Sequence, residues 1–250
     1  MNVLFLGKDQ RYEVIIDYLN KTHNVECIGY DNQKIGSLEH IDKYDIIILP
    51  MYGIKNGMID NIQITESIIN KIRDDCIIYT GLKPKELAYK KIISFMDDEK
   101  INDENNQITV EGIIDNIKDK DKSMICILGY GKIGKLLYDK LKSDYFVLVG
   151  VKKETDFLSR GVCFETGNLD CLKRNLQSST IIINTIPKNI ITEDIASNIK
   201  GYILDIASSP YGIKQSLVSK YHLNYYLYSS IPAKYDPKRA GKLLLKKFRR

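Results

Sequence analysis

The feature that most constrains the fold is a glycine-rich turn in the middle of the chain. The apolar run Met124 to Leu128 leads into the segment Gly-Tyr-Gly-Lys-Ile-Gly at 129–134, and an amphipathic helical pattern follows. A Gly-x-Gly-x-x-Gly turn between a strand and a helix is typical of dinucleotide binding, because it lets a pyrophosphate approach the backbone at the positive end of the helix. A plain βα turn is the alternative. We predict cofactor contacts along the whole turn: Gly129, Tyr130, Gly131, Lys132, Ile133 and Gly134.

The next predicted strand indicates which dinucleotide binds. The run Tyr145 to Val151 predicts a buried strand, which ends about twenty residues beyond the glycines, where an NAD site places an acidic residue on the ribose. Lys152 and Lys153 stand there instead, and Glu154 follows them. Two cations can pair with a 2′-phosphate, so we expect NADP to be preferred over NAD. The alternative is two solvated lysines at a strand end.

Composition excludes several other classes of protein. Of the 250 residues, 44% are hydrophobic and 28% charged, which is ordinary for a globular protein. The net charge of +5 comes partly from the basic C-terminal tail, so it does not indicate a nucleic-acid partner. No apolar run approaches the ~20 residues of a membrane span, and the first residues predict a strand and not a signal peptide. We therefore expect no nucleic-acid and no membrane partner.

Cysteine and histidine usage indicates a reducing compartment and no metal site. The five cysteines are odd in number and spread along the chain without a Cys-x-x-Cys pair, which suits buried thiols in a cytoplasmic protein. The three histidines lack the spacing of metal ligands.

Strand and helix patterns alternate along the chain, which is typical of α/β folds. We expect two doubly wound domains with a cleft between them: a flavodoxin-like domain at 1–108 and a Rossmann dinucleotide-binding domain at 109–235. The acidic segment 97–106 predicts a loop, and a hinge helix at 109–121, capped by Thr109, would then open the second domain. We expect a C-terminal helix at 236–250 to pack back towards the first domain.

Polar residues follow several predicted strands, where ligands bind in open α/β sheets. Turn and cap chemistry is the alternative explanation for each of them. Asp205 is a stronger candidate, because it lies within an apolar strand and a buried carboxylate needs a partner. The other candidates are Asn184, Thr185 and Pro187 for the cofactor, with Asp9, Arg11, Gly81, Ser208 and Ser209 as further ligand-binding residues.

Several of these segments together resemble one family, that of the A-subunits of dipicolinate synthase. The resemblance rests on Asn-Thr-Ile-Pro at 184–187, Ile-Leu-Asp-Ile-Ala-Ser at 203–208 and Thr-Val-Glu-Gly at 109–112. It also includes Gly7-x-Asp9-x-Arg11, Ile-Leu-Pro at 48–50, Gly81, Ile231-Pro232, Pro237, Ala240 and Gly241. These matches span nearly the whole chain in the right order. The chain departs from the family in its short length and at Ser209, where the family often has arginine.

The resemblance implies an enzyme of sporulation in the cytoplasm of the mother cell. It would oxidise a dihydrodipicolinate-type intermediate to dipicolinate with NADP, as a hetero-oligomer with the flavoprotein-like B-subunit of the synthase, and a homodimer is compatible with it. The substrate carries two carboxylates, for which Arg11 is the best bidentate partner. Asp9, Gly81, Ser208 and Ser209 would complete the substrate site. Glu111 and Asp205 are the candidates for the base that removes the ring proton.

Two other classes remain open. A 2-hydroxyacid dehydrogenase would share the two-domain fold but relies on a histidine paired with a carboxylate, and His222 lies just before a predicted strand. A nucleotide-sensing module without chemistry would share the glycine turn but would not need polar residues at the strand ends.

Overall fold

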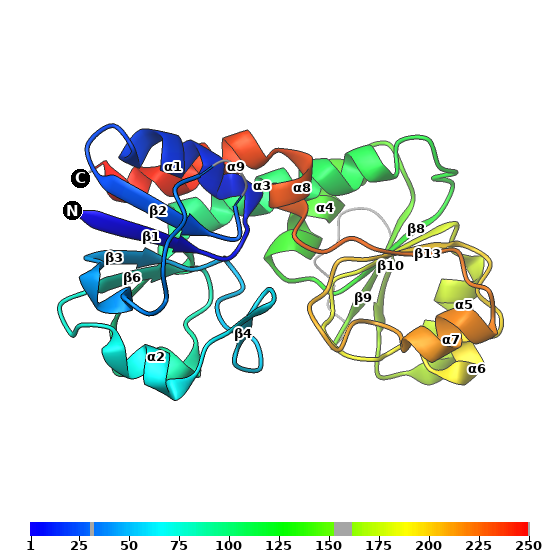
Figure 1. The fold of residues 1–250 in the computed structure, drawn as a ribbon. Helices are drawn as coiled ribbons and strands as arrows, with labels where there is room; N and C mark the ends of the chain where they lie inside the picture. Colours follow the sequence, from blue (N-terminus) through cyan, green and yellow to red (C-terminus); the bar gives the residue numbers. More distant parts are fainter. Residues whose placement is uncertain (31–32, 153–161, 250) are drawn as a thin grey trace. The chain divides into compact units, whose positions relative to one another are not determined.

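A computed structural model describes residues 1–30, 33–152 and 162–249 (Figure 1). The chain forms two compact units: Met1–Asn105 with Pro232–Arg250, and Asn106–Ile231. Each unit is built on its own parallel sheet, so the predicted class of two doubly wound α/β arrays is confirmed.

The sheet of the first unit has the order β2-β1-β3-β6-β7. Counted along the chain, this is the order 2-1-3-4-5 of flavodoxin-like folds. All of its strand pairs are parallel, so the carboxyl ends lie along one edge. The strands are β1 (Asn2–Leu6), β2 (Asn24–Ile28), β3 (Ile46–Ile48), β6 (Ile77–Thr80) and β7 (Lys91–Ser94).

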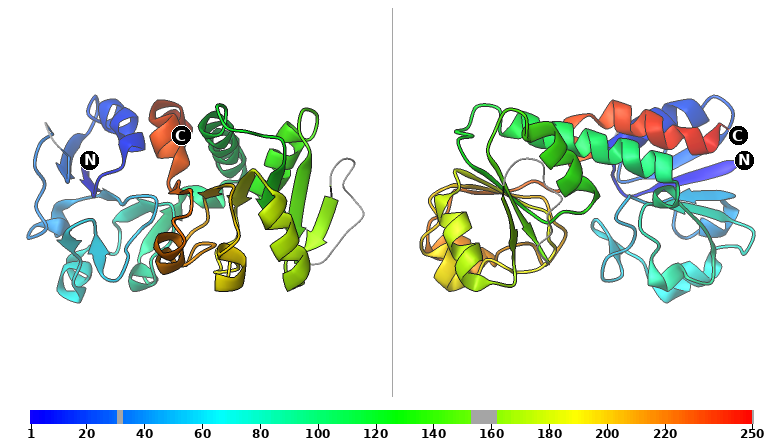
Figure 2. Two further views of the ribbon diagram at one scale, coloured as in Figure 1. Left: turned by 90° about the vertical axis from the view of Figure 1, so that its right-hand side faces the viewer. Right: turned by 180° about the vertical axis from the view of Figure 1, so that it is seen from behind.

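Helices cover both faces of this sheet (Figures 1 and 2). On one face, α1 (Glu13–Leu19) packs beside α9 (Pro237–Leu245), where Gly241 is required because a Cβ there would lie 2.2 Å from the carbonyl oxygen of Arg11. The expected C-terminal helix is thus α9 followed by the 3₁₀ turn η5 (Lys246–Phe248). The other face carries α2 (Glu66–Lys71). The remaining pieces are the hairpin β4 (Met58–Ile59) and β5 (Ile62–Gln63), and the 3₁₀ turns η1 (Gln10–Tyr12), η2 (Ile41–Lys43), η3 (Lys85–Leu87) and η4 (Phe95–Asp97).

The long helix α3 (Glu99–Asn116) corrects the expected loop at 97–106 and the expected hinge helix at 109–121. The helix begins at Glu99, so Thr109 is an interior residue and not an N-cap. Its early turns carry few apolar residues, which is why the pattern indicated a loop. Polar residues take part in its buried face instead: Asn106 is 8% exposed and Thr109 is 7% exposed.

The sheet of the second unit has the order β10-β9-β8-β11-β12-β13, which is the Rossmann order 3-2-1-4-5-6. Its strands are β8 (Ile125–Leu128), β9 (Val147–Val151), β10 (Val162–Glu165), β11 (Ile181–Asn184), β12 (Tyr202–Asp205) and β13 (Tyr225–Leu227). The helices are α4 (Lys132–Leu141), α5 (Leu169–Ser178), α6 (Glu193–Ala196) and α7 (Gln215–Lys220), and α8 (Ile231–Tyr235) lies at the boundary of the units.

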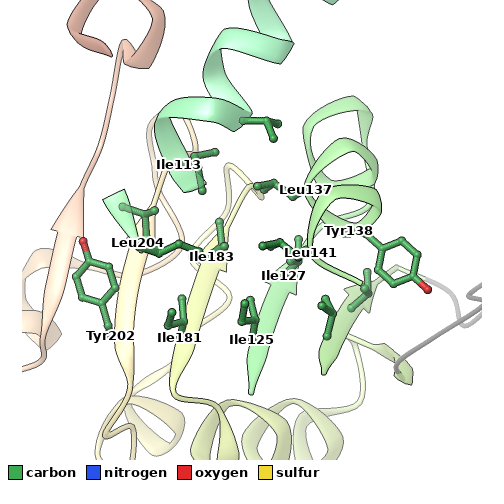
Figure 3. Close-up of a cluster of buried hydrophobic side chains, with 14 of the residues drawn as sticks. Ile113, Ile125, Ile127, Leu137, Tyr138, Leu141, Ile181, Ile183, Tyr202 and Leu204 are labelled. Carbon is green, nitrogen blue, oxygen red and sulfur yellow. The ribbon is translucent and has the colours of Figure 1, made fainter. Parts of the chain in front are cut away.

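Alternating residues of the central strands build two cores, one of which is drawn in Figure 3. Ile125 and Ile127 of β8 pack under α3 and α4 with Ile113 and Leu137, whereas Cys126 and its neighbours face α5 and α6 on the other side. This two-sided burial fixes the sheet, so that its carboxyl edge presents the loops of the candidate site.

Two kinds of feature are absent from the described residues. None of their helices is both long enough and apolar enough to cross a membrane. Within the same residues, His, Cys, Asp and Glu form no cluster of three that could hold a metal ion.

Candidate functional site

The glycine turn joins β8 to α4. Gly129 has φ of +101°, and a Cβ there would lie 2.2 Å from the hydroxyl oxygen of Thr185. A Cβ on Gly134 would lie 2.1 Å from the carbonyl oxygen of Gly129, so α4 packs against the turn itself. By contrast, Gly131 is the exposed N-cap of α4, with no atom within 4 Å of its Cβ direction. The turn therefore leaves the start of α4 open to a phosphate.

A cavity of about 810 Å³ lies at the carboxyl ends of the strands beside this turn. That volume is in the range of small-molecule and cofactor sites. Three of the predicted cofactor residues line it, namely Gly129, Tyr130 and Lys152, while Lys153 lies outside the described residues. The remaining lining residues are Lys135, Val151, Thr166, Gly167, Ile186, Lys188 and Ile190.

Two lysines that line the cavity, Lys135 and Lys188, were not predicted from the sequence. Lys135 lies in α4 with its Nζ 5.6 Å from the ring centroid of Tyr130, and Lys188 follows β11. With Lys152 they bring three exposed ammonium groups to one cavity, a charge pattern that favours phosphates. Only the approximate ends of β11 and α4 were predictable, so no sequence signal marked these two lysines.

The other predicted cofactor residues are not among those that line the cavity. Asn184 is fully buried, and the hydroxyl of Thr185 donates to the carbonyl oxygen of Leu128 at 2.8 Å. Pro187 is exposed beside the lining residues, and Lys132 and Ile133 belong to the first turn of α4. For these residues the cofactor contact stays a prediction.

Asp205 is the last residue of β12 and not an internal strand residue as expected. Its side chain is fully buried. The predicted need for a partner is met by four donors: the Asn184 amide at 2.8 Å, the backbone N–H groups of Ala207 at 3.1 Å and Gly212 at 2.7 Å, and the Tyr225 hydroxyl at 3.3 Å. Both carboxylate oxygens are thus engaged, which favours a structural task over proton transfer.

The other predicted residues of this unit lie in different settings. Ser208 and Ser209 are exposed in the loop that follows β12, so their hydroxyls are accessible. Glu111 is half-buried on α3.

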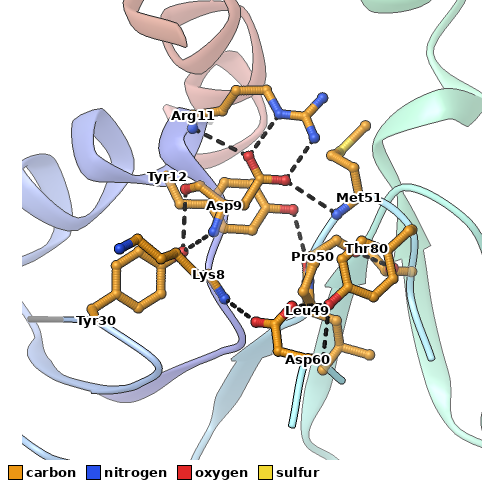
Figure 4. A network of polar contacts seen from close by, with 11 residues as sticks. Lys8, Asp9, Arg11, Tyr12, Tyr30, Leu49, Pro50, Met51, Asp60 and Thr80 are labelled. Atoms are coloured by element: carbon orange, nitrogen blue, oxygen red, sulfur yellow. Dashed lines mark hydrogen bonds and ion pairs between the residues drawn. The ribbon is translucent and has the colours of Figure 1, made fainter. Parts of the chain in front are cut away.

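In the first unit, Asp9 and Arg11 bind each other at the carboxyl end of β1 (Figure 4). The Arg11 Nε and Nη2 atoms donate to the two Asp9 oxygens at 2.7 and 2.6 Å, and both residues are 7% exposed. Burial alone would lower the pKa of Arg11, but the hydrogen bond and charge of Asp9 outweigh it and raise that pKa. The pair is therefore a buried, bidentate ion pair, and its binding of a substrate carboxylate stays a prediction.

The same edge contains further polar contacts (Figure 4). The Met51 N–H donates to Asp9, and the Lys8 N–H donates to Asp60 at 2.7 Å. The Tyr30 hydroxyl lies between the N–H and C=O groups of Asp9, and burial raises the pKa of Tyr30, which keeps it protonated. Gly81 packs tightly, because a Cβ there would lie 2.3 Å from the carbonyl oxygen of Met51. Packing alone therefore requires a glycine at position 81, whether or not a substrate binds there.

Comparisons with known proteins agree with the resemblance inferred from the motifs. No protein-family model matches the chain. The A-subunit of dipicolinate synthase from Bacillus subtilis (strain 168) is 24% identical over 284 aligned positions, which cover 98% of this chain and 93% of the relative. The crystal structure of the dipicolinate synthase A-subunit from Bacillus halodurans has a TM-score of 0.83 at 22% identity, covering 99% of this chain and 96% of that one.

A third structure represents the wider fold. NAD-dependent formate dehydrogenase from Staphylococcus aureus in complex with NAD has a TM-score of 0.61 at 12% identity, covering 99% of this chain and 94% of that one. The resemblance to the A-subunits of dipicolinate synthase and the α/β fold with two parallel sheets are thus both confirmed.

Proposed function

We propose that this chain is the NADP-binding subunit of a dipicolinate synthase and oxidises a dihydrodipicolinate-type substrate to dipicolinate. The observation that carries the proposal is the similarity to a dipicolinate synthase A-subunit over 98% of the chain. The cavity beside the glycine turn supports it independently, because an oxidation of this kind needs a bound hydride acceptor.

The cofactor would lie along the carboxyl edge of the second sheet. Its pyrophosphate would bind at Gly131 and the free amides that begin α4, where the helix dipole is positive. Its 2′-phosphate would pair with Lys152 at the end of β9, with Lys135 and Lys188 adding positive charge.

When bound, NADP supplies the acceptor for the hydride. The protein must then hold a planar dicarboxylate and accept a ring proton. The exposed hydroxyls of Ser208 and Ser209 are proposed to donate to a substrate carboxylate. Glu111, half-buried on α3, is the carboxylate that we propose as the base.

The 2-hydroxyacid dehydrogenase alternative needs a catalytic histidine near the cofactor. His222 is exposed and precedes β13, so it lies at the amino end of that strand, away from the carboxyl edge. His23 likewise precedes β2. Their positions favour the dipicolinate proposal over this alternative.

From the resemblance we also propose the setting in which the enzyme works. It would act in the cytoplasm of the mother cell of a sporulating bacterium, together with a flavoprotein-like second subunit.

Cofactor choice gives a first test. We expect NADP to bind more tightly than NAD, and Lys152→Asp to weaken NADP binding roughly tenfold or more, because it removes a charge-assisted contact and adds a like charge. A second variant adds Lys153→Ser and should prefer NAD. Isothermal titration measures both affinities, with Lys140→Asp on the exposed side of α4 as the control. Equal affinities for the two dinucleotides in the wild type would contradict the proposal.

The reaction itself is tested with a panel of substrates. The protein, with and without the flavoprotein-like subunit, is mixed with NADP and either dihydrodipicolinate or a set of 2-hydroxy acids, and the absorbance of NADPH is followed. We expect NADPH to form with dihydrodipicolinate and not with any of the 2-hydroxy acids. NADPH formed with a 2-hydroxy acid in its place would favour the alternative.

A further inference from the structure

The loop between β12 and α7 is held at both ends by one carboxylate. Asp205 Oδ1 accepts the N–H of Ala207 at 3.1 Å, and Oδ2 accepts the N–H of Gly212 at 2.7 Å. Between these two residues the loop is exposed at Ser208, Ser209 and Pro210. The Tyr211 N–H closes it by donating to the carbonyl oxygen of Ser208 at 2.9 Å. The conformation of this loop therefore depends on the Asp205 side chain.

The neighbouring strands hold the carboxylate in turn. The Asn184 amide of β11 donates to Oδ1 at 2.8 Å, and the Tyr225 hydroxyl of β13 donates to Oδ2 at 3.3 Å. Burial and the nearby charge of Asp205 raise the pKa of Tyr225, which keeps its hydroxyl a donor. Because Asp205 is fully buried, these donors and not bulk solvent balance its charge.

The same network reaches the wall of the cofactor cavity. The side chain of Asn184 accepts the N–H of Ile186 at 3.2 Å and donates to its carbonyl oxygen at 3.0 Å. The carbonyl oxygen of Gly212 accepts the N–H groups of Ile190 and Ile191 at 3.0 Å each. Ile186 and Ile190 both line the cavity. Asp205 thus connects the loop that carries Ser208 and Ser209 to the segment 186–190, beside which the cofactor would bind.

We propose that Asp205 is a positioning residue that fixes Ser208 and Ser209 relative to the cofactor cavity, so that they bind a carboxylate of the substrate. The substrate part of this inference rests on the proposed function. Serving as the base is the competing role for Asp205. A base would have to bind a proton on an oxygen that already accepts hydrogen bonds, and this would release the loop that it holds.

The two roles differ in steady-state kinetics. Asp205→Asn keeps the shape of the side chain but turns one acceptor into a donor that faces other donors. We expect the KM for dihydrodipicolinate to rise roughly tenfold to a hundredfold, as for lost hydrogen bonds to a charged group, with kcat changed less than about threefold. The Kd of NADP should rise less than KM, because the pyrophosphate site at Gly131 is untouched. A fall in kcat at constant KM would mean that Asp205 is the base. Unchanged KM and kcat would mean that Asp205 has only a structural role. Either result overturns the proposal.

Hydrogen exchange tests, without any turnover, whether Asp205 holds the loop. We expect the amides of Ala207 and Gly212 to be protected in the wild type and to exchange at least about tenfold faster in Asp205→Asn, while Asp194→Asn, an exposed carboxylate on α6, leaves them unchanged. Equal exchange in the wild type and in Asp205→Asn would show that Asp205 does not hold the loop, and this result overturns the proposal. A wild type that turns over no dihydrodipicolinate is a different result, which contradicts the proposed function and not the hold of Asp205 on the loop.

A second variant covers the case that Asp205→Asn does not fold. Gly212→Ala keeps the carboxylate but places a Cβ 2.5 Å from the Asn184 amide nitrogen, so the end of the loop must shift. It should raise KM in the same way, and an unchanged KM with a folded protein contradicts the proposal.

Discussion

Gly131→Asp is expected to weaken NADP binding by roughly 100- to 1000-fold without destabilising the protein. Gly131 is the N-cap of α4, has an extended backbone with φ of −76°, and faces open space, so an aspartate fits there. Aspartate is a favoured N-cap, and the stability should therefore be unchanged or slightly higher. Its charge would occupy the position proposed for the pyrophosphate, where two charges about 4 Å apart cost on the order of 4 kcal/mol.

The matched control for this prediction is Gly131→Asn, which has the same shape without the charge. It should lose less affinity for NADP than Gly131→Asp does, and the difference between the two variants measures the electrostatic part. Isothermal titration with NADP and a thermal melt on each variant complete the test. NADP affinity retained in Gly131→Asp would mean that no phosphate binds at the start of α4.

Arg11→Ala is expected to destabilise the first unit by about 3–5 kcal/mol. Its guanidinium is bound bidentately to Asp9 and both are 7% exposed, so the variant leaves a buried carboxylate without its cation. For a chain of this size the midpoint of thermal unfolding should fall by roughly 6–20 °C. Urea unfolding followed by circular dichroism measures the loss.

Arg73→Ala is the control, because Arg73 also makes a bidentate contact, with Asp75, but its side chain is 40% exposed. That variant should unfold close to the wild type. A wild-type unfolding midpoint for Arg11→Ala would contradict the buried ion pair.

The double variant Asp9→Asn/Arg11→Met separates the stability role of the pair from the predicted substrate role. It removes both charges, and the side-chain oxygen of the introduced asparagine can still accept one of the two backbone N–H groups that bind Asp9, so part of the stability should return. If Arg11 also binds a substrate carboxylate, KM should still rise roughly tenfold to a hundredfold in this folded variant. An unchanged KM would assign the pair to stability alone.

Local patterns predicted the parts of this fold that depend on neighbouring residues in the chain. Apolar runs identified the central strands, and the spacing of Gly129, Gly131 and Gly134 predicted the turn that begins α4. The position of Lys152 at the end of β9 was predictable as well, because strand length and the glycine turn fix it.

What the sequence did not reveal depends on contacts between distant residues. The start of α3 was missed because its early turns carry few apolar residues, and the polar residues Asn106 and Thr109 are buried instead. Arg11 was predicted as a ligand for a substrate, but its nearest anion is Asp9, two residues away, and only the turn after β1 brings the two together. Likewise, the four donors around Asp205 come from β11, β13 and the loop, which no local pattern joins.

The most direct test of the proposed function is the stoichiometry of the reaction. The wild-type protein and the flavoprotein-like subunit are mixed with limiting dihydrodipicolinate and excess NADP, and NADPH and dipicolinate are quantified in the same sample. We predict that both products appear in equal amounts, and that Gly131→Asp forms both far more slowly at the same NADP concentration. Dipicolinate formed without NADPH, or formed equally well by Gly131→Asp, would contradict the proposed function.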